Sequence, residues 1–296
     1  MIVKKVVITA AGLGTRLLTA TKEMPKEMLP LFCLGSNLEL LMKPILQLVF
    51  EQLYGIGFRE FCFIVGRDKR AIEDHFTPDY KYVDLLIKKG KVSKAKELED
   101  FYNKIKYSTI VWINQPEPRG FGDAVLLAKP FIGNEAFLVH AGDTYIISEE
   151  DKHLRMLLSY YEKRKTYALL ILKEVFDPSK LYGVADVDIK NSVIKVKKVV
   201  EKPKKPTTNL AIMPIYIFDP MIFKALEVTP LGVDNEIQLT DAIQKLIDWN
   251  MDVEAIKLEL DDIRLDVGTP ETYWEALSIS FHYFSKKLKE HDKFLK

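Results

Sequence analysis

Short stretches of β-type residues alternate with longer amphipathic stretches along this chain, and this alternation constrains the fold more than any other feature. The predicted strands are 6–9, 61–65, 110–113, 136–139, 167–172, 193–200, 211–218 and 253–258. The predicted helices are 44–53, 67–76, 220–226, 236–249 and 269–288. Strands that alternate with helices form a largely parallel sheet with helices on both faces. We therefore predict an α/β fold, with a mostly parallel mixed sheet flanked by helices on both faces.

Charge and composition exclude several classes of protein. The 296 residues carry 43 Lys and Arg against 42 Asp and Glu, which argues against bulk nucleic-acid binding. An apolar fraction of 48% argues against disorder. Cys33 and Cys62 fit neither a disulfide framework nor a Cys-based zinc site, so we expect buried, reduced thiols. No apolar stretch is long enough for a membrane helix, and we expect a cytoplasmic protein with no membrane or nucleic-acid partner.

A glycine-rich loop follows the first predicted strand. Because Ala10-Ala11-Gly12-Leu13-Gly14-Thr15-Arg16 comes directly after 6–9, the apolar N-terminal stretch reads as a strand and not as a signal peptide. Glycine lets the backbone approach a ligand closely and expose its N–H groups. Leu17 replaces the third glycine of a dinucleotide-binding loop, and no Gly-Lys-Ser/Thr of a Walker A loop is present. By itself the loop is equally compatible with a tight turn.

The cations that follow this loop favour a polyphosphate ligand. Arg16, Lys22 and Lys26 come next, and Lys26 lies between Pro25 and Pro30, which restrain its loop. A triphosphate needs both backbone donors and full positive charges. We assign Arg16 and Lys26 to such a site and interpret Lys22 as a solvated surface residue.

Two aspartates follow apolar segments in distant parts of the chain. Asp143 comes shortly after the strand 136–139, and Asp266 ends a short apolar segment. Ligands of α/β sheets bind beyond the carboxyl ends of strands, and Mg²⁺ prefers a few carboxylates together with phosphate oxygens and waters. The spacing alone is equally compatible with a turn at Asp143 and a helix cap at Asp266. We interpret His140 as a packed residue and not as a ligand.

A basic ribbon surrounds a single carboxylate in the second half. Its lysines are 195, 197, 198, 202, 204 and 205, and most are best explained as solvated. Glu201-Lys202-Pro203 differs because it ends a Val-rich strand at a proline. A carboxylate there could accept hydrogen bonds from sugar hydroxyls, while the adjacent lysine meets a phosphate.

Several sequence blocks together resemble one family. The N-terminal blocks are Ala10-Ala11-Gly12-Leu13-Gly14-Thr15-Arg16, Ala20-Thr21-Lys22 and Pro25-Lys26-Glu27-Met28-Leu29-Pro30. The later blocks are Gly120-Phe121-Gly122-Asp123-Ala124, Val200-Glu201-Lys202-Pro203, Asn209-Leu210-Ala211-Ile212 and Glu236-Ile237-Gln238-Leu239-Thr240-Asp241-Ala242-Ile243. They resemble, in order and over nearly the whole chain, the UTP–glucose-1-phosphate uridylyltransferases, which are sugar-phosphate nucleotidyltransferases. The resemblance implies their Rossmann-like nucleotide-diphospho-sugar transferase fold.

The resemblance implies roles for individual residues. Arg16, Lys26 and Lys202 would be catalytic. The nucleotide would be bound by Ala11, Gly12, Gly14, Thr15, Glu27, Gln115 and Gly120. Gln115 matches the residue that reads the pyrimidine edge, and Gly120 matches a close backbone approach to the base. Gly183, Glu201 and Lys202 would bind the sugar phosphate, and Asp143 and Asp266 would hold Mg²⁺.

The implied reaction transfers UMP from UTP to glucose 1-phosphate and gives UDP-glucose and pyrophosphate. A phosphate oxygen of the sugar phosphate attacks the α-phosphorus in line, so catalysis is mostly positioning and charge neutralisation. The implied partners are UTP, glucose 1-phosphate, Mg²⁺ and further copies of the chain in a dimer or tetramer. The alternatives are a thymidylyltransferase or another nucleotidyltransferase for a different sugar 1-phosphate, a glycosyltransferase, and a nucleotide-sugar sensor without turnover.

We expect a single nucleotidyltransferase domain over residues 1–296. About 1–145 would form the nucleotide-binding half, with a helical insert at 80–106 that is broken at Gly90. About 146–296 would form the sugar-phosphate half and the C-terminal helix. No repeat or Pro/Gly linker separates the two halves, which favours one continuous sheet.

The chain departs from the family pattern at four places. Thr19 stands where proline is usual, and the short Asp-Lys-Pro segment is stretched to residues 33–44. Asp123 replaces a usual histidine, and Asp143 lacks a second neighbouring acid. These changes lie around the expected nucleotide site, so they bear on base and sugar choice more than on reaction class.

Overall fold

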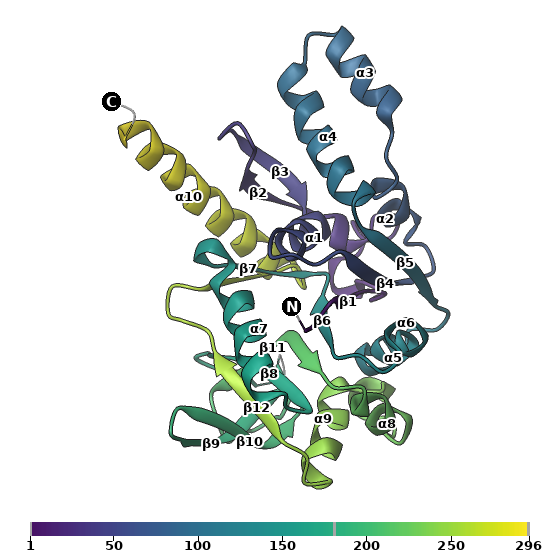
Figure 1. Ribbon diagram of the computed structural model, residues 1–296, viewed down its shortest axis with the longest axis vertical. Coiled ribbons are helices and arrows are strands. Elements are labelled where there is room, and N and C mark those ends of the chain that lie inside the picture. The colour runs from purple at the N-terminus through teal and green to yellow at the C-terminus, as the bar shows by residue number, and fades with distance from the viewer. Residues whose placement is uncertain (1, 180–181, 295–296) are drawn as a thin grey trace.

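The computed structural model describes residues 2–179 and 182–294, and within these ranges nine strands form one central sheet (Figure 1). The strand order across the sheet is β5, β4, β1, β6, β11, β8, β12, β10, β9. Their bounds are β5 Thr109–Gln115, β4 Glu60–Gly66, β1 Lys5–Ala10, β6 Phe137–Ala141, β11 Leu210–Phe218, β8 Ala168–Glu174, β12 Val253–Lys257, β10 Val193–Val200 and β9 Val184–Lys190. The predicted α/β fold with a mixed sheet is confirmed.

The parallel character of the sheet is confined to part of it. β5, β4, β1 and β6 run parallel, as do β8 and β12. β11 is antiparallel to both β6 and β8, and β9 and β10 form an antiparallel hairpin whose turn residues Asn191 and Ser192 have positive φ. The prediction of a mostly parallel sheet therefore holds for the first half of the chain, whereas the second half is largely antiparallel. Strands from both halves belong to this one sheet.

Helices cover both faces of the sheet, because alternate residues of each strand point to opposite faces. In β1, Val6 and Ile8 join the core on one face and Val7 joins the core on the other. The first face is covered by α1 Ile45–Gly55, α2 Arg70–His75 and α7 Lys152–Arg164. The second face is covered by α5 Phe121–Leu127, α6 Lys129–Ile132, α8 Met221–Glu227 and α9 Leu239–Asp248. Cys33 and Cys62 are buried free thiols, as expected.

Two small antiparallel sheets flank the central one. β2 Pro30–Leu34 pairs with β3 Leu40–Pro44, and β7 Thr144–Ile147 pairs with β13 Ile263–Asp266. The C-terminal helix α10, Pro270–Phe294, packs on β2 and β13 and closes a third apolar core with α1. The residues 33–44 thus form most of a hairpin that the strand pattern did not predict.

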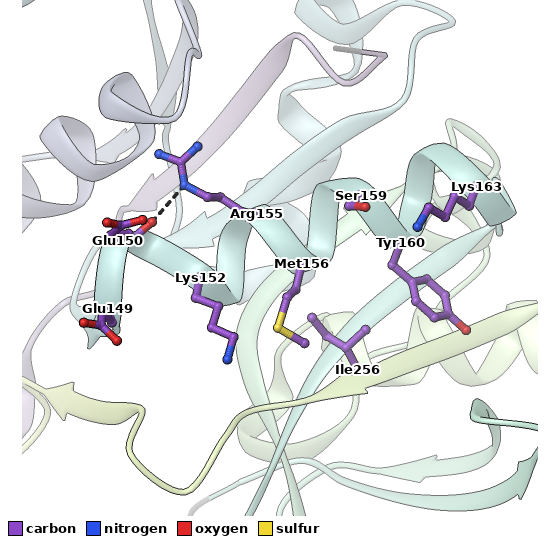
Figure 2. A pocket seen from close by; sticks show the side chains of 9 residues that line it. All are labelled: Glu149, Glu150, Lys152, Arg155, Met156, Ser159, Tyr160, Lys163 and Ile256. Carbon is purple, nitrogen blue, oxygen red and sulfur yellow. Dashed lines mark hydrogen bonds between the residues drawn. The ribbon is translucent and has the colours of Figure 1, made fainter.

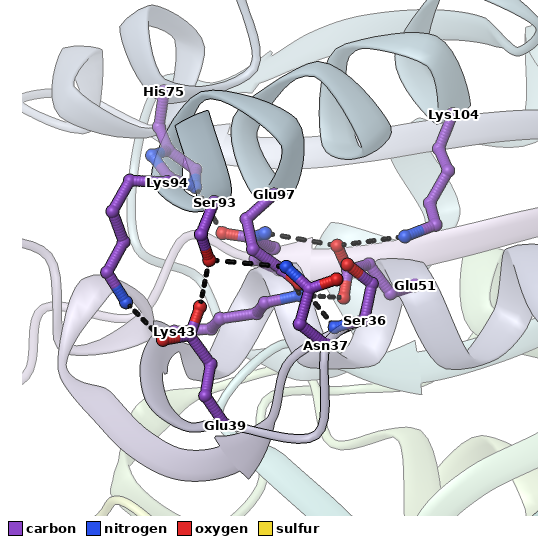
Figure 3. Close-up of polar contacts among 11 residues, drawn as sticks. Ser36, Asn37, Glu39, Lys43, Glu51, His75, Ser93, Lys94, Glu97 and Lys104 are labelled. Carbon is purple, nitrogen blue, oxygen red and sulfur yellow. Dashed lines mark hydrogen bonds and ion pairs between the residues drawn. The ribbon is translucent and has the colours of Figure 1, made fainter. Parts of the chain in front are cut away.

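The helical insert forms a helix pair that projects from the body (Figure 1). α3 Tyr80–Lys88 and α4 Val92–Lys106 are separated at Gly90, which has a φ of +71°, so the predicted break is confirmed. Figure 3 shows that polar side chains join α4 to the β2–β3 hairpin and α1. Lys43 Nζ lies 2.9 Å from Glu51 Oε2 and 3.5 Å from Glu97 Oε2. Lys43 therefore links the β2–β3 hairpin both to α1, through Glu51, and to the helical insert, through Glu97.

Some predicted boundaries are corrected by tertiary contacts. The helix predicted from Glu236 begins at Leu239, because the Ile237 N–H donates to the Arg119 carbonyl at 2.8 Å. β7, β9, α5 and α7 were not predicted as separate elements. No helix among the described residues is long and apolar enough to cross a membrane.

Candidate active site

A cleft of about 940 Å³ opens where β1, β5 and β6 end, and it contains every residue that the sequence assigned to a site. The residues shared between that assignment and the cleft lining are Ala11, Gly12, Gly14, Thr15, Arg16, Lys26, Glu27, Gln115, Gly120, Asp143, Gly183, Glu201, Lys202 and Asp266. Segments far apart in sequence therefore meet at the carboxyl edge of the parallel strands, which is the usual ligand position in such sheets.

The glycine-rich loop leaves β1 and turns back at Gly14. Gly14 has a φ of +66°, a conformation that costs a residue with a Cβ about 1–2 kcal/mol. Its carbonyl accepts hydrogen bonds from the Leu17 N–H at 2.9 Å and from Thr21 Oγ1 at 2.8 Å. These hydrogen bonds fix the short 3₁₀ helix Thr15–Leu17, which contains Arg16. Lys22 lies outside this arrangement, exposed beside Glu23, as expected.

Lys26 and Glu27 enter the cleft on a short 3₁₀ helix, Lys26–Met28. Lys26 Nζ donates to Asp143 Oδ2, and Glu27 pairs with Lys69 Nζ at 2.9 Å. Burial disfavours the charged form of Lys26, but the carboxylates of Asp143 and Glu27 outweigh it and raise the pKa of Lys26. Glu27 is 1% exposed, and its ion pair with Lys69 anchors the 3₁₀ helix Lys26–Met28 to the protein.

Asp143 and Asp266 lie side by side because β7 pairs with β13. Asp266 is the register partner of Thr144, and the Val267 N–H donates to the Asp143 carbonyl at 3.1 Å. Asp143 lies in the turn between β6 and β7, and Asp266 ends β13 and does not cap α10. Thr269 caps α10 instead, through its Oγ1 and the Thr272 N–H at 3.2 Å.

The two aspartates differ in their electrostatic surroundings. Burial raises the pKa of Asp143, but the Lys26 ammonium overcomes this effect and lowers the pKa of Asp143 below its usual value. Burial raises the pKa of Asp266, and the neighbouring Asp143 carboxylate adds to this increase, although Arg264 opposes it. Arg264 Nη2 donates to Asp266 Oδ1 at 2.7 Å.

These two carboxylates fit a hard divalent cation. Among the described residues, no group of three or more His, Cys, Asp and Glu side chains is arranged to hold a metal ion. Two carboxylates at an open cleft suit Mg²⁺, which usually keeps several waters and takes further oxygens from substrate phosphates. His140 does not contribute, because it is fully buried in β6 and its Nδ1 pairs with the Ala141 carbonyl oxygen at 2.7 Å.

The opposite wall of the cleft carries the Glu201 carboxylate and the Lys202 ammonium. Thr240 Oγ1 donates to Glu201 Oε2 at 2.6 Å, and a Cβ on Gly183 would lie 3.0 Å from both of these atoms. Burial raises the pKa of Glu201. Lys202 has a φ of +39°, and its N–H donates to the Tyr182 carbonyl at 3.1 Å. Its ammonium lies 3.2 Å from Asp234.

Gln115 and Gly120 form the third part of the cleft. Gln115 ends β5, is 4% exposed, and donates through Nε2 to the Gly120 carbonyl at 3.2 Å and to Asp123 Oδ2 at 2.8 Å. Gly120 has a φ of +106°, and a Cβ there would lie 2.8 Å from the Ile237 carbonyl oxygen. A residue with a Cβ at position 120 would therefore clash with the Ile237 carbonyl, so the position requires glycine.

Sequence reasoning missed four residues that hold the site together: Lys69, Arg264, Asp234 and Thr240. Arg264 was detectable, because it stands two residues before Asp266 and residues at that spacing share one face of a strand. Thr240 belongs to a block that was recognised without a role. Lys69 and Asp234 carry no local signal, since their partners lie far away in sequence.

A second hollow, of about 700 Å³, runs along α7 (Figure 2). Two of its cations are already engaged: Lys152 pairs with Glu259 at 2.5 Å, and Arg155 Nε donates to the Glu150 carbonyl at 2.8 Å. Tyr160 extends away from α7, and its hydroxyl donates to Glu254 at 2.9 Å. None of the residues assigned from the sequence lines this hollow. The cleft is therefore the candidate active site.

Comparisons with known proteins find relatives that match most of the chain. The UTP–glucose-1-phosphate uridylyltransferase of Staphylococcus haemolyticus (strain JCSC1435) is 39% identical over 273 residues, which cover 90% of this chain and 88% of that protein. The enzyme of the same name from Bacillus subtilis (strain 168) is 39% identical over 269 residues, or 90% of this chain and 87% of that protein.

Solved structures resemble the whole chain. A UDP-glucose pyrophosphorylase complexed with UDP-glucose superimposes with a TM-score of 0.81 at 32% identity, over 96% of this chain and 99% of that one. A UTP-bound UGPase from Acinetobacter baumannii gives a TM-score of 0.81 at 28% identity, and the match covers 99% of this chain and 100% of that one. The resemblance inferred from the sequence blocks is thereby confirmed. Residues 5–280 match the family model described as "Nucleotidyl transferase", and the chain therefore belongs to the nucleotidyl transferase family.

Proposed function

We propose that this chain transfers UMP from UTP to glucose 1-phosphate and releases UDP-glucose and pyrophosphate. The observation that carries the proposal is the meeting, in one cleft, of a glycine-rich loop, two adjacent aspartates and the Glu201–Lys202 pair. Two anionic reactants need this combination of backbone donors, cations and carboxylates. The relatives named as uridylyltransferases support the choice of nucleotide and sugar.

Positioning and charge neutralisation account for catalysis in this proposal. An oxygen of the sugar's phosphate attacks the α-phosphorus of UTP, the bond from that phosphorus to the bridging oxygen breaks, and pyrophosphate leaves in line. The attacking phosphate is already ionised at neutral pH, so no general base is needed. Arg16 and Lys26 hold the triphosphate, and Lys202 holds the incoming phosphate.

The walls of the cleft would select the two substrates. Glu201, which Thr240 orients, accepts hydrogen bonds from sugar hydroxyls beside the backbone of Gly183. Gln115 reads the edge of the base, while Gly120 lets the backbone approach it. The backbone around the phosphates comes from Ala11, Gly12, Gly14 and Thr15. Glu27 also lines the nucleotide site and is paired with Lys69.

Members of this family generally use a divalent metal ion, and we propose Mg²⁺ for this chain. Asp143 and Asp266 would hold it, because their carboxylates are adjacent at the open side of the cleft. When bound, the ion supplies positive charge to the phosphate oxygens. Lys26 and Arg264, which pair with these aspartates in the free protein, balance their charge.

A pyrophosphate assay tests the proposal. The protein is incubated with Mg²⁺, glucose 1-phosphate and, in separate reactions, UTP, dTTP, CTP, ATP and GTP, and pyrophosphate and nucleotide sugar are measured together. We expect both products from UTP only when the sugar phosphate is present. Turnover with dTTP in preference to UTP would favour a thymidylyltransferase, and no product with any pair would contradict the proposed reaction. Replacing glucose 1-phosphate with other sugar 1-phosphates tests sugar choice.

We also propose that the protein works in the cytoplasm and as a homo-oligomer. Two buried free thiols fit a reducing compartment. The exposed side of α10 carries Trp274 and Phe281, which are 71% and 43% exposed, and these could form part of a subunit contact. Light scattering coupled to size-exclusion chromatography measures the mass directly, and a monomer at micromolar concentration would contradict the second proposal.

A further inference from the structure

We propose that Asp123 is a positioning residue that fixes the orientation of the Gln115 side-chain amide and thereby selects bases with a ring N–H donor, such as uracil, over cytosine. This inference rests on the proposed function, because it concerns the base of the nucleotide substrate.

The amide orientation follows from the chemistry of its two partners. Gln115 Nε2 is 3.2 Å from the Gly120 carbonyl oxygen and 2.8 Å from Asp123 Oδ2. A carbonyl and a carboxylate only accept hydrogen bonds, and the amide nitrogen has two hydrogens to donate. Both hydrogens are therefore used. The flipped amide would place Oε1 against two acceptors, so it is excluded.

Both acceptors are held in place by the fold. Gly120 precedes α5, and its neighbours are clamped by hydrogen bonds from the Ile237 N–H to the Arg119 carbonyl and from the Gly122 N–H to the Ile237 carbonyl. Asp123 lies in the first turn of α5, where the helix dipole stabilises a carboxylate. Its side chain is 13% exposed, and Oδ1 lies 3.9 Å from Arg119 Nε. The carboxylate is therefore a fixed, charged acceptor.

The consequence is a defined acceptor on the cleft side. With Nε2 committed to Gly120 and Asp123, Gln115 presents Oε1 as its remaining polar atom, and Gln115 lines the cleft. Uracil and thymine carry a donor at N3, whereas cytosine carries an acceptor there. An Oε1 that cannot exchange places with Nε2 accepts from the first two bases and repels the third. A polar group left unpaired in this way discriminates strongly between similar ligands.

Asp123→Asn tests the inference, because it keeps the shape but lets the side chain donate as well as accept. Steady-state kinetics give KM and kcat for UTP, dTTP and CTP with saturating sugar phosphate. We expect the UTP-to-CTP ratio of kcat/KM to fall about tenfold, through KM, because one of the two acceptors that exclude the flipped amide is lost. The kcat for UTP should remain within about threefold of wild type.

The ratio of kcat/KM for UTP to kcat/KM for dTTP should stay unchanged in Asp123→Asn, since both bases present the same N3–H. Glu117→Gln is the matched control: it removes a carboxylate from the same loop at an exposed position outside the cleft, and it should keep wild-type ratios. An unchanged UTP-to-CTP ratio in Asp123→Asn would overturn the inference, as would equal losses for all three nucleotides.

The two proposals fail in different ways. If the wild-type protein makes no pyrophosphate with any nucleotide, the proposed function fails, and calorimetric binding of UMP and CMP to wild type and Asp123→Asn still tests the amide orientation. If Asp123→Asn does not fold, as judged by its thermal transition, the UTP-to-CTP ratio of kcat/KM is measured for Asp123→Glu instead. This variant keeps a carboxylate but displaces it from Gln115 Nε2, so the ratio should fall as well. A wild-type UTP-to-CTP ratio for a misplaced carboxylate would contradict the inference.

Discussion

At the scale of single residues, charged side chains of the cleft form ion pairs with one another in the free protein. Lys26 pairs with Asp143, Arg264 pairs with Asp266, and Lys202 pairs with Asp234. Buried charges are costly unless they are paired, so the largely buried Lys26 and Arg264 need their carboxylates in the free protein. The Lys202–Asp234 pair is more exposed, and its partners depend less on each other. Lys26 and Lys202 are also cations that the proposed mechanism assigns to phosphates, whereas Arg264 balances the charge of Asp266.

Lys202→Ala tests the assignment of the incoming phosphate. Losing one charge-assisted contact in the transition state costs about 3 kcal/mol, so kcat/KM should fall about a hundredfold. The steady-state rate of pyrophosphate release measures it. Lys205→Ala, in the same basic ribbon but exposed and outside the cleft, is the control and should remain near wild type. Near-wild-type turnover of Lys202→Ala would remove this residue from the mechanism.

Asp266→Asn tests the proposed metal site. The amide lacks the negative charge that attracts the ion, and we expect the Mg²⁺ concentration for half-maximal rate to rise about tenfold or more. Titration of the rate with Mg²⁺ measures this, and chelation with EDTA should abolish turnover of the wild type. If the Mg²⁺ dependence of the variant matches wild type, Asp266 is not a ligand.

At the scale of elements, loops that follow strands carry the site, and their positions depend on neighbouring elements. The Gly120-Phe121-Gly122 turn is built against residues 236–237, which is why α9 begins later than its sequence pattern predicts. A Cβ at Gly120 would lie 2.7 Å from the Glu236 Cβ and 2.8 Å from the Ile237 carbonyl oxygen. The approach of the β5–α5 loop to α9 therefore requires glycine.

Gly120→Ala should separate the strain of a positive φ from the cost of this close contact. We expect a loss of about 2–4 kcal/mol in the free energy of unfolding and a raised KM for UTP, because the loop must move away from residues 236–237. Gly57→Ala is the matched control: Gly57 has a similar φ of +112°, but nothing lies within 4 Å of its Cβ position. Urea unfolding measures the free energy of unfolding of both variants, and steady-state kinetics measure the KM for UTP. Equal losses in the two variants would show that the contact contributes nothing.

At the scale of the whole molecule, the core contains two neutral histidines that couple its stability to pH. His153 on α7 has both ring nitrogens buried without a hydrogen-bond partner among the described residues, and His140 in β6 is fully buried. Burial lowers the pKa of His153 to about 3 and that of His140 to about 4, from an ordinary 6.5. The unfolded chain therefore binds more protons below pH 6.5, and stability is lost as the pH falls from there.

His153→Leu should make the protein less sensitive to acid. Each such histidine contributes a slope of about 1.4 kcal/mol per pH unit between roughly pH 6 and pH 4, and the variant removes one of them. Urea unfolding at several pH values measures the slope directly. A slope equal to that of wild type would mean that His153 is protonated in the folded protein.

Most of the fold and the positions of the site follow from local patterns in the sequence. Strand and helix periodicity predicted the buried strands, the C-terminal helix and the break at Gly90, because each depends on neighbours within a few residues. The glycine-rich loop, Lys26 and Glu201-Lys202-Pro203 carry distinctive local composition. The β2–β3 hairpin was missed, because its residues give no distinct period. α7 was missed although Leu154, Leu157, Leu158 and Tyr161 recur at helical spacing.

The sequence by itself determined the fold class, the family resemblance and part of the cleft lining, but not Arg264, Asp234 or Thr240. Only the tertiary structure decided which residues meet: that β13 brings Asp266 beside Asp143, that Lys69 supports Glu27, and that Asp123 orients Gln115. The physical reason is range. Backbone propensity and periodicity act over a few residues, whereas pairings of buried charges and hydrogen-bonding groups join segments up to more than a hundred residues apart and exist only once the chain has packed.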